Sequence, residues 1–174
     1  WRFTHAAGEH VPREGAGGWA GWAGAWAGVG GGAGGVGCRR GSNGMVPRAP
    51  LTGLMAVCGG VMLDVKAWEP VVHRALTGAD NAPVKENLAF LSACGKLAEV
   101  RVVCAPDAVD VEAVLDGVAA ALGPRAPSTP VKLITFRPNG VRGALAGRPS
   151  PTPAQMTAWR AYALSAGLGA VLLR

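Results

Sequence analysis

The pattern of apolar and polar positions separates residues 51–174 from the sequence before them. Apolar stretches of strand length alternate there with longer stretches whose apolar residues recur at helical spacing. The predicted strands are residues 61–66, 99–104, 131–136 and 169–173. Between them, helix-length segments predict the order strand, helix, helix, strand, helix, strand, helix, strand. Helix-length connections between apolar strands favour a parallel sheet, so we predict an α/β fold, either an open sheet or part of a barrel.

Helix boundaries are marked by capping residues and glycines. Pro70 begins a short helix that Gly78 ends, and Asp80 or Asn81 can cap the next helix, which runs to Gly95. Asp107 or Asp110 caps an amphipathic helix that stops at Gly123. The spacing Thr152 to Gln155 is that of a capping box. The buried face of this last helix is expected to carry Met156, Trp159 and Ala163.

Residues 1–50 have a different composition and are predicted to be a low-complexity, disordered segment, which places the domain boundary at residue 50. The uncharged run of residues 15–38 has the length of a membrane span, but glycine and alanine contribute too little to insertion. The glycines of residues 30–35 lack the preceding strand and the following Lys-Ser/Thr of a phosphate-binding loop. We therefore expect neither a membrane helix nor a nucleotide loop here.

The formal net charge is +6, but basic residues are scattered and only Arg39 and Arg40 are adjacent. Scattered basic residues are weak support for nucleic-acid binding, and an anionic small molecule is the alternative partner. The four cysteines form no C-x-x-C pair and no disulfide framework, which favours a reducing, cytoplasmic compartment. Cys94 and Cys104 are expected to be buried in apolar surroundings. No metal site is expected from the dispersed histidines, and no serine has a histidine and aspartate relay.

Asp64 and Lys66 are the first candidates for chemistry. Side chains alternate along a strand, so Met62, Asp64 and Lys66 share one side of the predicted strand, at its carboxyl end. Parallel α/β folds collect ligand-binding residues at this edge. The alternative is a solvated strand end with an ion pair of no functional role.

Further candidates lie on the next two strands. Arg101 points away from the apolar Val102 and Cys104, and if it shares the face of Asp64 it can bind a carboxylate. The alternative is an arginine in solvent at the sheet edge. Arg137, Asn139 and Arg142 follow the third strand, where loops carry ligands, although the residue pattern alone favours a solvated loop. His73, Asp80 and Asn81 are interpreted as structural residues.

The residues quoted so far resemble a known family. Val61-Met62-Leu63-Asp64-Val65-Lys66 resembles the V-M-L-D-[LV]-K strand of glycyl-radical-enzyme activases, the pyruvate formate-lyase activating enzyme group of radical S-adenosylmethionine proteins. Residues 76–81 resemble the L-x-G-x-x-N segment of that family, and residues 99–106 resemble its R-x-V-V-x-P strand. The helix at residues 84–91, the strand and turn at residues 132–140 and the helix and strand at residues 152–173 follow in the same order.

The resemblance covers about residues 54–174 and implies a fold and a ligand site. The fold would be the C-terminal part of a radical S-adenosylmethionine partial (β/α) barrel. Asp64 would hold the amino-acid end of S-adenosylmethionine, with or without a monovalent cation, near the backbone of Met62. Lys66 and Arg101 would lie at the same site, and Asn139 stands where the family has a cofactor-contacting histidine.

The sequence departs from the family upstream of these residues. The family binds a [4Fe–4S] cluster through C-x-x-x-C-x-x-C and binds S-adenosylmethionine through G-G-E-P, and neither segment occurs here. We therefore expect a truncated activase that binds no cluster and is inactive alone, with a glycyl radical enzyme as the family's partner. The alternative is a degenerate, non-catalytic α/β fragment or partner-binding module. A partial barrel also has exposed strand edges, which predict self-association.

Overall fold

The computed structural model describes residues 39–45, 47, 52, 55, 58–139, 141 and 145–174. All of them belong to one unit of the chain, Gly37–Arg174. The predicted disorder of residues 1–38 lies outside the described residues. Thr52 and Met55, upstream of the first predicted strand, are both helical.

Five parallel strands form one sheet in the order of the sequence. They are β1 (Arg39–Ser42), β2 (Gly60–Val65), β3 (Leu97–Cys104), β4 (Pro130–Thr135) and β5 (Ala170–Leu173). The four strands predicted from the sequence are all present. Strand β1 was not predicted and lies inside the segment that was interpreted as low-complexity, so the sheet begins upstream of the expected boundary.

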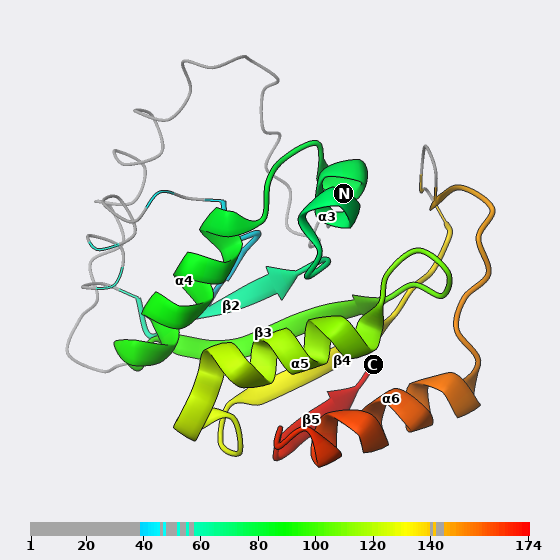
Figure 1. Cartoon of the computed structure of the whole chain (residues 1–174). Helices are drawn as coiled ribbons and strands as arrows, with labels where there is room; N and C mark the ends of the chain where they lie inside the picture. Colours follow the sequence, from blue (N-terminus) through cyan, green and yellow to red (C-terminus); the bar gives the residue numbers. More distant parts are fainter. Residues whose placement is uncertain are drawn as a thin grey trace. The chain divides into compact units, whose positions relative to one another are not determined.

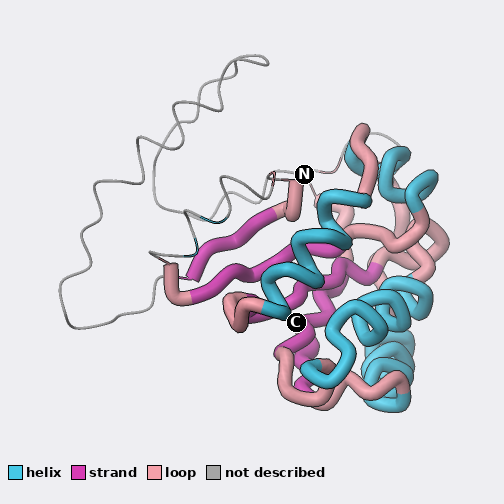
Figure 2. Tube along the Cα trace, turned by 60° about the vertical axis from the view of Figure 1, so that its left-hand side comes forward, coloured by secondary structure: helices cyan, strands magenta, loops and turns pink. Residues whose placement is uncertain are grey.

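The helices are α3 (Pro70–Thr77), α4 (Ala82–Ala93), α5 (Val111–Leu122), the 3-10 turn η1 (Gly123–Arg125) and α6 (Pro153–Ser165). Helices α4, α5 and α6 pack against one face of the sheet, in front of the strands in Figure 1 and to one side of them in Figure 2. Right-handed connections between neighbouring parallel strands in sequential order place every crossover helix on that same face. Helix α3 lies beyond the carboxyl end of β2 (Figure 1).

Alternation along the strands divides the sheet into two chemically different faces. The face under the helices is apolar and closed, with Leu63, Val100, Val102, Val131 and Leu133 all fully buried. These side chains meet the apolar stripes of the helices, among them Leu88 and Leu115. The other face carries Met62 and Asp64 on β2 and Glu99 and Arg101 on β3, and none of α4, α5 and α6 covers it.

The helix boundaries follow the capping pattern in the sequence. Gly78 ends α3 in a left-handed conformation, which glycine adopts without strain. Asp110 accepts a hydrogen bond from the Ala113 backbone N–H at the start of α5. The capping box of Thr152 and Gln155 is present at the start of α6. Met156 and Ala163 of that helix are buried and Trp159 is partly buried, as the spacing predicted.

The cysteines differ in their surroundings. Cys58 and Cys104 are buried and reduced, but Cys94 is exposed, so its predicted burial was wrong. Cys94 follows the last residue of α4 and lies with Ala93 and Gly95 in an exposed turn, whereas Leu91 of the same helix is buried. No helix in the described ranges has the length and apolar character that a membrane span requires.

Candidate functional site at the carboxyl ends of the strands

Asp64 and Arg101 meet on the face of the sheet that lies opposite the helices. The two residues are partners in the register of β2 and β3. Arg101 Nε lies 2.7 Å from Asp64 Oδ1, an ion-pair distance, although the N–H is not directed well enough to form a hydrogen bond. The expectation that Arg101 shares the face of Asp64 and contacts its carboxylate is therefore confirmed.

Lys66 approaches Asp64 from the other side. It follows directly after the last residue of β2, and its Nζ donates a hydrogen bond to Asp64 Oδ2 at 3.1 Å. Each carboxylate oxygen thus has its own cationic neighbour. Residues two positions apart lie on the same face of an extended chain, so Asp64 and Lys66 can form this pair.

A third ion pair lies next to these two and was not anticipated from the sequence. Lys132 is the register partner of Arg101 on β4, and its Nζ lies 2.6 Å from Glu99 Oε2. The other carboxylate oxygen, Oε1, is buried without a hydrogen-bond partner. Alternation could have placed Glu99 beside Arg101, because the two are separated by two positions on one strand.

We call these charged residues, Lys66, Asp64, Arg101, Glu99 and Lys132, the charged row. Their side chains are only 11–21% exposed, so the ion pairs are shielded more than surface pairs. Three cations and two carboxylates leave the row with one excess positive charge. A half-buried site of this kind favours a ligand that brings a carboxylate or another anionic group.

The segment after Lys66 is anchored by a buried asparagine. Asn81 Nδ2 donates hydrogen bonds to the backbone carbonyls of Ala67 and Trp68, at 3.2 and 2.6 Å. Of the two predicted capping residues, Asp80 and Asn81, it is Asp80 whose side chain accepts from the first turn of α4, through the Ala82 N–H. Asn81 instead fixes the chain that leaves the charged row.

Trp68 secures the same segment against two helices. Lys85 Nζ of α4 lies 4.6 Å from the centre of the Trp68 ring, in a cation–π contact. On the side of α5, the ring occupies the space that a side chain at Gly117 would need. These contacts hold the carboxyl end of β2, and with it Asp64 and Lys66, in one place.

The remaining predicted site residues lie at the margin of this group. Met62 is half-buried on the same strand face as Asp64. Asn139 is exposed in the loop after β4, and no hydrogen bond or ion pair joins it to Asp64, Lys66 or Arg101. Arg137 is exposed in the same loop, and Arg142 lies outside the described residues. Their role as ligand contacts stays a prediction.

The next question is whether the described residues can provide the ligands of an iron–sulfur cluster. Among the residues that the structure describes, no three histidine, cysteine or acidic side chains gather where they could hold a metal ion. Burial raises the pKa of the Cys104 thiol from 9.0 to about 12, which opposes the thiolate form that a cluster needs. The residues described here therefore do not fit a [4Fe–4S] cluster.

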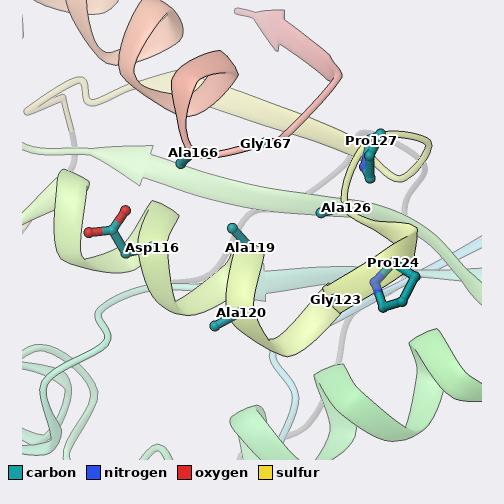
Figure 3. Close-up of a pocket in the computed structure, with 9 residues that line it drawn as sticks. All are labelled: Asp116, Ala119, Ala120, Gly123, Pro124, Ala126, Pro127, Ala166 and Gly167. Atoms are coloured by element: carbon teal, nitrogen blue, oxygen red, sulfur yellow. The ribbon is translucent and has the colours of Figure 1, made fainter.

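One open groove of about 500 Å³ lies away from the charged row. Its lining comes from the end of α5, from η1 and from the turn between α6 and β5, including Asp116, Pro124, Pro127 and Gly167 (Figure 3). These segments precede β4 and β5, so the groove is at the amino edge of the parallel sheet. The ligand-binding edge of such folds is the opposite one.

Comparisons with known proteins bear on the fold. The sequence matches no protein-family model, and a search of curated proteins finds no significant relative. The structure is similar to the crystal structure of a domain of pyruvate-formate lyase-activating enzyme from Bacteroides vulgatus ATCC 8482. The TM-score is 0.64 at 11% sequence identity, over 78% of this chain and 80% of that chain. This likeness confirms the predicted α/β fold class: the chain shares the fold of an activating-enzyme domain.

Proposed function

We propose that the described sheet is the S-adenosylmethionine-binding wall of an activase-like protein, and that the charged row is its ligand site. The observation that carries this proposal is the position of Asp64 between Lys66 and Arg101, at the carboxyl edge of a parallel sheet. The shared fold of the activating-enzyme domain supports the assignment. Whole activases would act on a glycyl radical enzyme, and we propose such an enzyme as the partner.

The charges of the row suit the amino-acid end of S-adenosylmethionine. This end carries one carboxylate and one ammonium group. Lys66 and Arg101 would bind the carboxylate, and Asp64 would accept from the ammonium group. The backbone at Met62 and the amide of Asn139 would contribute neutral hydrogen bonds from the strand and from the loop after β4.

Two cations of the charged row, Lys66 and Arg101, supply the positive charge at Asp64 that a bound monovalent cation would otherwise supply. Both oxygens of Asp64 already have a protein cation within 3.1 Å. A potassium or sodium ion on Asp64 would add positive charge next to Lys66 and Arg101, which is unfavourable. We therefore propose that ligand binding by this chain does not require an added monovalent cation.

In activases the [4Fe–4S] cluster supplies the electron that cleaves S-adenosylmethionine. The described residues do not fit that cluster, and the cysteines of the sequence lack the required spacing. We propose that this chain alone binds and orients S-adenosylmethionine without cleaving it. The same observation favours a second candidate function, a non-catalytic module that retains the ligand wall or binds a partner protein.

The test is calorimetric titration of the purified chain with S-adenosylmethionine, with Asp64→Ala and Lys66→Ala as site variants. Both variants are expected to lower the affinity by roughly tenfold or more, because each removes a charge-assisted contact. Arg74→Ala is the matched control, since Arg74 forms an exposed ion pair with Asp80 on α3. Equal affinities of wild type and Asp64→Ala would contradict the site assignment.

A separate experiment addresses the cluster. The chain is incubated anaerobically with iron and sulfide, desalted, and examined for the visible charge-transfer absorbance of an iron–sulfur cluster. We expect no stoichiometric cluster. A stable cluster in the isolated chain would overturn the proposal that it cannot cleave S-adenosylmethionine, and would leave the ligand-binding proposal standing.

A further inference from the structure

We propose that Glu99 is a positioning residue of the ligand site and acts through Arg101. When a cationic group of the ligand occupies Asp64, the Nε–H of Arg101 turns to Glu99 Oε1, an acceptor that has no hydrogen-bond partner in this structure. The inference rests on the proposed function and deepens it, because it states how the site makes room for the ammonium group of an amino acid.

The two side-chain atoms that lack a hydrogen bond lie on the same face of β3. Within the described part of the chain, Glu99 Oε1 and Arg101 Nε are the buried side-chain atoms without a hydrogen-bond partner. One is an acceptor and the other is a donor, and their residues are two positions apart on the strand. A buried polar atom without a partner costs free energy, so an unpartnered donor beside an unpartnered acceptor points to a second arrangement in which they meet.

A contact between these two side chains is within reach. Asp64 and Lys66 are also two positions apart on one strand face, and they form a hydrogen bond of 3.1 Å. Glutamate is longer than aspartate by a methylene group, and arginine is at least as long as lysine, so Glu99 and Arg101 can span the same separation. Lys132 holds Glu99 from β4 through the other oxygen, Oε2, at 2.6 Å, which leaves Oε1 able to accept.

Ligand binding supplies the reason for the exchange. Each oxygen of the Asp64 carboxylate already has a cationic neighbour, Lys66 or Arg101. An ammonium group that joined them would place three positive charges around one carboxylate, which is unfavourable in a half-buried site. Arg101 loses least by leaving, because its Nε–H is poorly directed toward Asp64, whereas Lys66 Nζ donates a hydrogen bond. The exchange engages one N–H of the guanidinium and leaves the others for the ligand carboxylate.

The experiment follows the side-chain Nε–H signal of Arg101 by NMR during titration with S-adenosylmethionine; the signal is identified by its loss in Arg101→Lys. It should move downfield at saturation, because a directed hydrogen bond to a carboxylate replaces a misdirected contact. The double variant Glu99→Leu with Lys132→Leu removes the acceptor together with its partner, an exchange of an ion pair for apolar residues that folds tolerate, and should lose this movement. Glu99→Gln keeps a neutral acceptor and should retain a smaller movement. The control Glu112→Gln, in an exposed position on α5, should match wild type.

A ligand-free measurement separates this inference from the proposed function. Asp64→Asn removes the carboxylate charge that competes for Arg101, so the Nε–H signal should move downfield without ligand, and the two leucine substitutions should abolish the movement. An unmoved signal in ligand-saturated wild type or in Asp64→Asn overturns the inference, as does a movement that survives the leucine substitutions. If wild type binds no S-adenosylmethionine, the proposed function fails, and the ligand-free measurement alone decides whether Glu99 is the second acceptor of Arg101.

Discussion

Arg101 on β3 and Asp64 on β2 are register partners, and Arg101 Nε lies 2.7 Å from Asp64 Oδ1. Lys66 holds the second oxygen of the same carboxylate at 3.1 Å. One aspartate therefore compensates two half-buried cations, and the rest of the charged row is arranged around this contact. A substitution of Asp64 should therefore change both ligand binding and the stability of the sheet.

Asp64→Ala is expected to lower the free energy of unfolding by about 1–3 kcal/mol, because it leaves Arg101 and Lys66 half-buried without their carboxylate. Urea denaturation of wild type and variant measures the change. The double variant Asp64→Ala with Arg101→Leu is expected to recover part of the loss, since one uncompensated charge is then removed. Arg74→Ala, in an exposed pair, should cost less than about 1 kcal/mol, and an equal effect of the two single variants would argue against a coupled row.

Gly117→Ala tests the contact between α5 and Trp68. Alanine is favoured over glycine in a helix by about 1 kcal/mol, but a Cβ at this position would collide with the Trp68 ring. We expect a net loss of about 1–3 kcal/mol in the free energy of unfolding, measured by urea denaturation. The matched control is Ala120→Gly on the same helix, which changes propensity alone and should cost about 1 kcal/mol. A stabilised Gly117→Ala variant would show that Trp68 does not pack as described.

The thiols are expected to react in the order of their exposure. Iodoacetamide at pH 8 should modify the exposed Cys94 readily and leave Cys104 unmodified until urea unfolds the chain. Burial raises the pKa of Cys104 from 9.0 to about 12, so the folded state holds its proton longer than the unfolded state. The stability contributed by this group is complete below pH 9 and is lost as the pH rises toward 12. Peptide mass spectrometry measures each site, and equal rates for the two thiols in the native protein would contradict their assigned burial.

The edge of the sheet at β5 is expected to support self-association. Leu172 and Leu173 are 51% and 45% exposed on this edge strand, and an unpaired strand edge can pair with another chain. Light scattering after size exclusion should show a concentration-dependent dimer. Leu173→Lys, which places a charge on the edge, should shift the equilibrium toward monomer. A wild-type monomer at high concentration would count against this prediction.

The strands and helices after residue 58 could be predicted because their apolar periodicity agrees with the core that they build. Strand β1 could not, because Arg39-Arg40-Gly41-Ser42 contains no apolar residue. Its extended state depends on backbone pairing with β2, a tertiary contact that leaves no trace in a local pattern.

Part of the candidate site could also be predicted from the alternation of apolar and polar residues along the strands. Alternation placed Asp64 and Arg101 away from the apolar face of their strands, but only the register of β2 and β3 decides that the two are neighbours. Lys132 and Glu99 were missed because their pairing depends on the register of β3 and β4. The exposure of Cys94 was missed because apolar neighbours in sequence do not determine which way the residue after a helix points.

The most direct test of the central claim is to map the binding site by NMR. Isotope-labelled protein is titrated with S-adenosylmethionine, and the backbone amide shifts of the described residues are followed. We predict saturable shifts at the carboxyl end of β2, around Asp64 and Lys66, and in the middle of β3, around Arg101, with little change in α5 and α6. Shifts confined to the groove around Asp116 and Gly167, or no saturable shift at all, would contradict it.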